Sequence, residues 1–200
     1  MPLYLGDTRI NIKNIIPALQ YNVVGDVSIT NGIASNFTDK TNYLLLAKPF
    51  NPGTRNWIFK TKIKFSSSSD TQTLIDRTVS RCFQISITNQ KKIKLHISKD
   101  GSAKTNEVTG THALSVDTWY YLTFEYTGTQ YICKYSTDGI NWTTEITINQ
   151  TAAVFQGQIL QIGRSFYLDG SEHWTGEVDL WNTYLGLNTE LLNVDNWKLN

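Results

Sequence analysis

Short runs of alternating apolar and polar residues fill most of the chain, and Gly, Asn, Asp and Ser interrupt them. Alternation with a period of two is typical of a strand with one buried face, whereas the 3.6-residue period of an amphipathic helix is almost absent. The strands that this pattern predicts are Trp57 to Phe65, Gln72 to Ile75, Cys82 to Thr88, Lys92 to Ser98, Trp119 to Thr127, Gln130 to Ser136, Thr143 to Ile148, Gln158 to Arg164 and Thr175 to Leu180. Many short, evenly spaced strands are typical of a sandwich or barrel, so the sequence predicts an all-β protein.

Turn residues connect several of these strands. Gly128 lies between two strongly alternating runs, where a glycine supplies the positive φ of a tight hairpin. Asp138-Gly139 favours a type I′ hairpin turn, whose twist matches that of the flanking strands. The polar, glycine-containing stretch from Lys99 to His112 is predicted to be a surface loop.

The two ends of the chain follow a different pattern. Leu3 to Ile10 is predicted to form a short β element with a Gly-Asp turn, and Pro17 discourages regular structure after it. We therefore predict an N-terminal arm or linker over residues 1–20 and one domain over residues 21–200. Thr189 to Leu199 is compatible with a short helical turn or with an edge strand.

Composition and charge exclude some classes of partner for the protein. The formal net charge is +1, and the lysines of Lys60 to Lys64 and Lys91 to Lys94 alternate with other residues, as on the solvated face of a strand. This distribution lacks the basic patch that nucleic-acid binding requires. No apolar stretch reaches the length of a membrane span, and the first residues do not resemble a signal peptide. We expect a soluble protein that is made in the cytoplasm and binds no nucleic acid.

The two cysteines, Cys82 and Cys133, each fall within a predicted strand. Their spacing matches no metal-binding or redox motif. Buried free thiols are the simpler expectation, and a disulfide between them is the alternative.

Several segments, taken in order, resemble the laminin G-like jelly rolls of the concanavalin A-like lectin and glucanase superfamily. They are Phe37 with Asn42 to Leu44, Asn56 to Ile63, Leu114 to Phe124, Tyr131 to Asn141, Leu160 to Gly163 and Trp174 to Leu180. The last two resemble the Ile-Gly and Gly-x-Ile-Asp closing strands of that family. The resemblance covers about residues 21–185 and implies an antiparallel jelly-roll sandwich of two sheets. Because the superfamily includes lectins, glycosidases, adhesion modules and structural domains, it implies the fold more sharply than the function.

The opening segment, Leu3 to Ile10, also resembles the short leader segments of phage and prophage tail and baseplate proteins. This second resemblance implies a virion protein whose N-terminal arm contacts other virion proteins. Since virion fibres are often trimeric, it also implies a homo-oligomer, with a trimer as the first expectation.

One motif tests whether the chain is an enzyme. Laminarinase-type glucanases of this superfamily carry a Glu-x-Asp-x-Glu strand, in which the pleat places three carboxylates on one face. Here Glu177 and Asp179 match the first two positions, but Trp181 occupies the third, and a one-residue bulge would bring Asn182 there instead. Neither side chain is a proton donor, so we expect no glycosidase activity and no catalytic residues.

Calcium is a second possibility, because many jelly-roll modules bind it through loop oxygens. The candidate ligands are Asp169 and Glu172, with Asp138 less favoured. They form no dense Asp-x-Asp-x-Asp run, so solvated loop acids are the simpler expectation, and no cofactor is predicted.

Aromatic and polar residues mix in the loop from Phe166 to Trp174, in a chain that contains 6 Trp, 10 Tyr and 8 Phe. The apolar faces of sugar rings stack on flat side chains, while carboxylates and amides bond to the hydroxyl groups. The candidate glycan ligands are Tyr167, Asp169, Glu172, His173, Trp174 and, from a separate hairpin, Trp142. Each Trp could equally cover the edge of the sandwich or a subunit interface, and for Trp174 packing in the core or at the edge is the simpler expectation. If the loop binds glycan, Trp174→Ala should abolish binding with little loss of fold.

These observations favour a lectin-like module that attaches a larger particle, such as a phage virion, to a glycan of the bacterial surface. The alternative is a structural virion or assembly protein that binds no glycan. A glycoside hydrolase is the third and weakest hypothesis.

Overall fold

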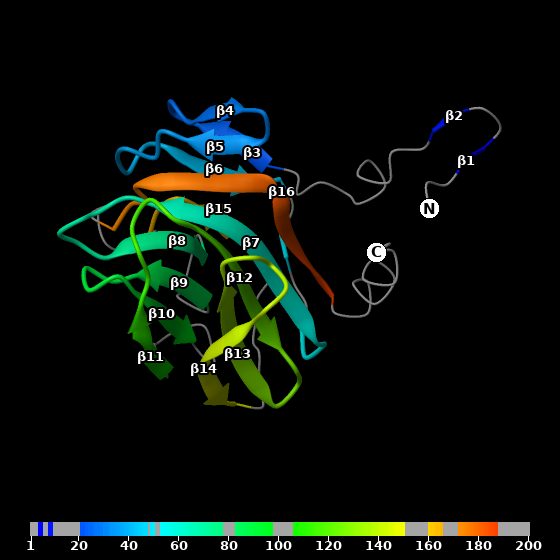
Figure 1. Cartoon of the computed structure of the whole chain (residues 1–200), viewed down its shortest axis with the longest axis vertical. Helices are drawn as coiled ribbons and strands as arrows, with labels where there is room; N and C mark the ends of the chain where they lie inside the picture. The colour runs from blue at the N-terminus through cyan, green and yellow to red at the C-terminus, as the bar shows by residue number, and fades with distance from the viewer. Residues whose placement is uncertain are drawn as a thin grey trace.

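Two antiparallel sheets of seven strands each stack into a jelly-roll sandwich in the computed structural model (Figure 1). The structure describes residues 4–5, 8–9, 21–47, 49–50, 53–77, 83–97, 106–150, 160–165 and 172–187. In spatial order, the first sheet contains β11 (Asn106–Ala113), β10 (Lys92–Ile97), β9 (Phe83–Ile87), β8 (Gln72–Arg77), β15 (Leu160–Ile162), β6 (Tyr43–Leu46) and β3 (Tyr21–Val24). The second contains β14 (Thr143–Asn149), β13 (Gln130–Ser136), β12 (Trp119–Tyr126), β7 (Trp57–Phe65), β16 (Gly176–Leu187), β5 (Ile33–Ser35) and β4 (Ser28–Thr30). The all-β prediction is confirmed.

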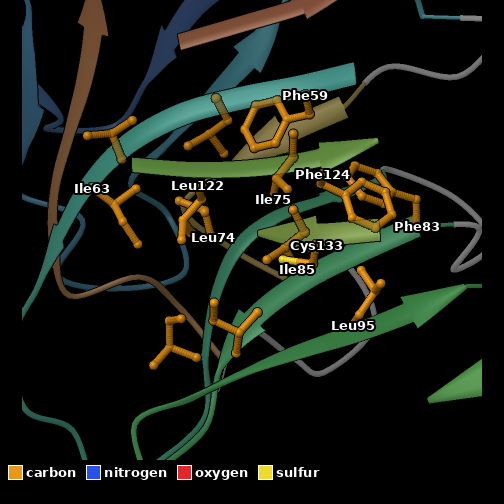
Figure 2. Close-up of a cluster of buried hydrophobic side chains, with 14 of the residues drawn as sticks. Phe59, Ile63, Leu74, Ile75, Phe83, Ile85, Leu95, Leu122, Phe124 and Cys133 are labelled. Atoms are coloured by element: carbon orange, nitrogen blue, oxygen red, sulfur yellow. The ribbon is translucent and has the colours of Figure 1, made fainter. Parts of the chain in front are cut away.

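The core lies between the sheets, where apolar side chains from alternate strand positions meet (Figure 2). Trp57 of β7 is fully buried, and its ring centroid lies 5.3 Å from those of both Phe83 and Phe124, so it joins the two sheets. Cys133 of β13 points into the same core as a free thiol, and its burial raises the pKa of the thiol to about 12. The prediction of a buried free thiol is confirmed for Cys133, whereas Cys82 lies outside the described residues.

Most strands that the alternation predicts agree with the structure, and β7 and β13 agree at both ends. The prediction of a loop from Lys99 to His112 is wrong in its second half, because Asn106–Ala113 forms β11. This strand lies at the edge of the first sheet, where its neighbour is β10. Most of its side chains are at least partly exposed, so it lacks the apolar alternation that predicts the other strands.

Two turns show how far local sequence predicts a hairpin. Gly128 has a φ of 93° between β12 and β13, as the sequence predicts. Asp138-Gly139 does join β13 and β14, but the type I′ prediction is wrong: Gly139 has a φ of 75° and Asp138 does not have a positive φ. The Asp138 carboxylate instead organises a longer loop, described below.

Near the N-terminus, β1 (Tyr4–Leu5) and β2 (Thr8–Arg9) pair antiparallel, which confirms the short β element predicted there. The C-terminal segment from Thr189 to Leu199 lies outside the described residues. Within the described part of the chain, no helix has the length and apolar character needed to cross a bilayer.

Candidate functional site

The outer face of the second sheet carries a row of polar and aromatic side chains. On β7 the side chains of Phe59, Thr61 and Ile63 point into the core, so those of Lys60, Lys62 and Lys64 point outward. Strand pairing sets Asp179 of β16, Lys62 of β7, Tyr121 of β12 and Ser136 of β13 side by side. We call these four residues the outer row. It crosses three inter-strand spacings and is therefore about 14 Å long.

Lysine ammonium groups lie over the aromatic rings of this face. Lys62 Nζ is 5.0 Å from the centroid of Trp119 and 5.2 Å from that of Tyr121, and Lys64 Nζ is 5.4 Å from that of Trp119. Lys60 Nζ lies 6.0 Å from the centroid of Trp142. These distances suit cation–π attraction, which holds the flexible lysine chains and the rings against each other.

At one end of the outer row, the carboxylate of Asp179 accepts hydrogen bonds from the loop that follows it, an arrangement that we call a clasp. Its Oδ1 accepts hydrogen bonds from the backbone N–H groups of Trp181 and Asn182 at 3.1 and 3.2 Å, and its Oδ2 accepts one from Asn182 Nδ2 at 2.7 Å. Asp179 pairs with Lys62 and Tyr184 pairs with Lys60, so β16 advances five positions while β7 advances two. The surplus residues form a bulge that leaves the sheet.

This bulge holds Trp181 on the surface. The Trp181 side chain is 71% exposed, although tryptophan is usually well buried. Its ring lies on the turn at Gly32, where a Cβ atom would come within 2.5 Å of the indole, and Leu180 N–H donates to the Gly32 carbonyl at 2.8 Å. Gly32 has a φ of 77°, so both the backbone conformation and the close approach of the ring require glycine. Trp181 is therefore exposed and fixed in position at once.

At the other end, the carboxylate of Asp138 clasps its loop in the same way. Its Oδ1 accepts from the N–H groups of Ile140 and Asn141, both at 2.8 Å, and its Oδ2 accepts from Asn141 Nδ2 at 2.7 Å. The Ser136 hydroxyl adds a bond of 2.8 Å. The backbone N–H groups of Asn141 and Ile140 are the main reason why the pKa of Asp138 lies well below its usual range.

Both clasps have the sequence Asp-x-x-Asn, and both expose the apolar residue at the third position. Ile140 is 80% exposed and Trp181 is 71% exposed, the two largest values among the big apolar side chains that the structure describes. The Tyr121 ring lies beside the Asp138 loop, since a Cβ atom at Gly139 would be 3.3 Å from it. The outer row thus contains one aromatic ring and has at each end a loop with an exposed apolar side chain.

The structure divides the glycan ligands predicted from sequence between two sheets. Trp142 lies near the outer row, beneath Lys60. Glu172 instead reaches the first sheet, where its Oε2 accepts bonds from Thr73 Oγ1 at 3.3 Å and Gln84 Nε2 at 3.4 Å. His173 is half-buried and forms an isolated bridge with Arg164. Tyr167 and Asp169 lie outside the described residues.

Trp174, a candidate glycan ligand in the sequence, packs in the core, which is the simpler of the two expectations for it. Trp174 has an exposed fraction of 0%, and its ring centroid lies 6.3 Å from that of Phe65 in the core. Its backbone N–H donates to the Gly163 carbonyl at 2.8 Å, which draws this residue into the sandwich. A ring buried in this way has no free face for a sugar. Among the tryptophans that the structure describes, Trp181 is the most exposed.

The structure also shows what the residues of the glucanase-like motif contact. Glu177 and Asp179 lie on one outward face, as the pleat predicts, but Glu177 pairs with Lys64 at 2.8 Å and Asp179 is occupied by the loop. The sequence predicts Trp181 or Asn182, and no third carboxylate, at the next outward position after Asp179. In the structure, the residue at that position after the bulge is Tyr184, which lies opposite Lys60. A tyrosine, rather than Trp181 or Asn182, stands where the third carboxylate would be.

Within the described ranges, no group of three or more His, Cys, Asp or Glu side chains could hold a metal ion. Of the predicted calcium ligands, Asp138 is taken up by its own loop, Glu172 bonds to Thr73 and Gln84, and Asp169 lies outside those ranges. Calcium binding therefore stays a hypothesis that depends on Asp169.

Comparison with known proteins supports the fold. No protein-family model matches the chain, and a search of curated proteins finds no match in sequence. Among solved structures, the exoplasmic/lumenal domain of VIP36 in a Ca²⁺/Man2-bound form is similar with a TM-score of 0.54 and 12% identity, over 80% of this chain and 78% of that one. The carbohydrate-binding module CBM40 of a Ruminococcus gnavus IT-sialidase has a TM-score of 0.53 and 13% identity, over 76% and 95%.

Domains LG4-5 of the mouse laminin α1 chain are also similar, with a TM-score of 0.53 and 11% identity; the match covers 84% of this chain and 41% of that one. At such identities the similarity shows a shared fold and nothing about ligands. The two-sheet jelly-roll sandwich that the sequence predicts is therefore confirmed.

Proposed function

We propose that this protein is a non-catalytic carbohydrate-binding module and that the outer row, with Trp181 at one end, is its glycan-binding surface. The observation that carries the proposal is the rigid exposure of Trp181, since a bulge, a carboxylate clasp and a glycine together hold one face of the indole towards solvent. Burying the exposed face of the indole under a ligand would be favourable, and its fixed position lowers the entropic cost of binding.

The chemistry of the row suits a saccharide. The C–H face of a pyranose ring can rest on the exposed ring of Trp181. Asn141 and Asn182 each use their amide nitrogen in a clasp, which leaves the amide oxygen to accept a hydrogen bond from a sugar hydroxyl. The fold neighbours include modules whose names describe carbohydrate binding, and this adds support at the level of the fold.

The arrangement of carboxylates on this face supports a binding role rather than hydrolysis. Retaining hydrolysis needs two carboxyl groups about 5 Å apart that are free to act as nucleophile and as acid. Glu177 is held by Lys64, Asp179 by the loop, and Tyr184 follows them. We therefore expect binding without cleavage.

A polysaccharide-binding assay with point variants tests the proposal. The wild-type protein should be retarded in affinity gels that contain bacterial surface polysaccharides or mammalian glycans. Covering about a third of an indole's roughly 200 Å² of surface is worth about 1.5 kcal/mol, so Trp181→Ala should weaken binding about tenfold. Trp181→Phe should retain part of the affinity, and Val23→Ala, an exposed apolar change on the first sheet, should have no effect. Wild-type binding by Trp181→Ala, or binding to no glycan at all, would refute the proposal.

We further propose that the glycan belongs to a bacterial surface and that residues 1–20 attach the domain to a virion. The support is the resemblance of Leu3 to Ile10 to virion leader segments, together with the antiparallel pairing of Tyr4 with Arg9. Mass measurement in solution tests the arm: the full chain should be a homo-oligomer, a trimer by first expectation, and deletion of residues 1–20 should lower the oligomeric state. A monomer that the deletion leaves unchanged would contradict this role.

A further inference from the structure

Lys62, at the centre of the outer row, forms a long ion pair with Asp179. Its nearest carboxylate oxygen is Asp179 Oδ2 at 3.8 Å, which is beyond hydrogen-bonding distance. That carboxylate accepts three hydrogen bonds from the loop at Trp181 and Asn182. It keeps its negative charge, but at 3.8 Å its attraction for Lys62 is weaker than that of a carboxylate in direct contact.

Other lysines on outward sheet faces are arranged differently. Lys64 bonds to Glu177 at 2.8 Å, Lys134 to Glu125 at 2.6 Å, and Lys94 of the first sheet to Glu107 at 2.6 Å. Each of these ammonium groups is neutralised by direct contact. Lys62 instead stands between the rings of Trp119 and Tyr121, and its side chain is only 23% exposed.

This position favours an anion. The rings attract the ammonium group electrostatically, but a ring face is a much weaker hydrogen-bond acceptor than an oxygen atom. Its N–H donors therefore remain available to a ligand atom at the surface. An anionic oxygen placed there would gain a charge-assisted hydrogen bond in a site that is already partly desolvated.

We infer that the glycan of this site is acidic, with an anionic group on Lys62 while the apolar face of the sugar rests on the neighbouring rings. The inference rests on the proposed function and specifies its ligand class: a saccharide whose pyranose ring bears a carboxylate. A sulfate ester would offer Lys62 the same anionic oxygens. Because a carboxylate belongs to the sugar ring itself, it can reach Lys62 while the ring stays close to the sheet.

Matched pairs of polymers test this inference, because they differ in charge and share a backbone. The probes are polygalacturonate and its methyl ester, hyaluronan and its methyl ester, and dextran sulfate beside dextran as the sulfate arm. Binding is measured by affinity gel at about 0.05 and 0.5 M NaCl, since salt screens a charge contact and leaves stacking in place. The wild type should bind at least one carboxylate polymer about tenfold more tightly than its ester, and the difference should shrink at high salt.

The variants are Lys62→Gln and, as the control, Lys94→Gln, which removes the same charge from the first sheet. Lys62→Gln should abolish the preference for the acid form, and Lys94→Gln should keep it. Equal binding of acid and ester by the wild type, or a preference that survives in Lys62→Gln, would overturn the inference. If Trp181→Ala then still weakens binding of both the acid and the ester, the protein binds glycan and only the assignment of an acidic glycan is wrong. Binding of dextran sulfate alone would overturn the carboxylate assignment. Binding of none of the polymers would overturn the inference, whereas the proposed function is decided separately by the glycan panel and Trp181→Ala.

Discussion

Replacing Gly32 by alanine should displace the Trp181 ring, because two features of Gly32 exclude a side chain. Its φ is 77°, a conformation that costs an alanine about 1–2 kcal/mol. A Cβ atom would also lie 2.5 to 2.7 Å from three atoms of the indole. Since Trp181 is 71% exposed, the ring can move outward and relieve the overlap. We therefore expect Gly32→Ala to destabilise the fold only moderately and to weaken glycan binding as much as Trp181→Ala does.

Gly139→Ala is a matched control for the backbone strain. Gly139 has nearly the same φ, 75°, but a Cβ atom there would lie 3.3 Å from the Tyr121 ring, a distance that needs only a small adjustment. Both changes should therefore carry the same cost of about 1–2 kcal/mol from φ. Any further loss in Gly32→Ala then measures the overlap with Trp181.

Urea unfolding, followed by far-UV circular dichroism, gives the free energies, and a double-mutant cycle isolates the contact. In a Trp181→Ala background, the cost of Gly32→Ala should fall to that of Gly139→Ala, because the indole is gone. If the cost is unchanged in that background, the ring does not rest on Gly32. If Gly32→Ala binds glycan like the wild type, the position of the ring does not matter for binding. Either result would refute the reasoning behind the rigid platform.

Two further predictions concern the core. Trp174→Ala removes a fully buried ring and should lower the free energy of unfolding by about 3–5 kcal/mol, measured by urea unfolding; a loss below about 1 kcal/mol would contradict its burial. For Cys133, folding raises the thiol pKa from 9.0 to about 12, so the unfolded chain ionises first as the pH rises. Stability should fall above pH 9, by up to about 1.4 kcal/mol per pH unit for this group, and Cys133→Ala should lack that part of the slope.

The sequence predicts the strands that have one buried and one solvated face, and it misses strands that lack this difference. Trp57–Phe65 is half buried and half solvated, so its alternation gives both ends of β7 correctly. Asn106–Ala113 is an edge strand with little buried surface, and its pairing with β10 depends on backbone hydrogen bonds that composition does not reveal. The short strands β4 and β5 escape prediction for a related reason, since their three residues are too few to show a period.

For the candidate site, the sequence and the structure point to different tryptophans. An aromatic residue among polar loop residues points to Trp174, because its neighbours are polar; yet a backbone bond to Gly163 draws that residue into the core. The strand pattern places Trp181 at the third position of a regular strand, whereas the bulge that carries it outward is set by a tertiary contact with Gly32. The repeated Asp-x-x-Asn pattern at Asp138 and Asp179 is the local signal that marks both exposed loops.

That repetition bears on how the outer row would bind a ligand. A loop that carried Trp181 or Ile140 loosely would have to be ordered on binding, and each immobilised side chain would reduce affinity by about 0.5–1.5 kcal/mol. Here the Asp179 and Asp138 carboxylates satisfy the backbone N–H groups of both loops in advance, at 2.8 to 3.2 Å. The platform is therefore formed before the ligand arrives, and the sheet holds its two ends at a constant separation. A site of this kind discriminates by spacing, so it should favour an extended glycan chain that reaches both loops over a single sugar that reaches one.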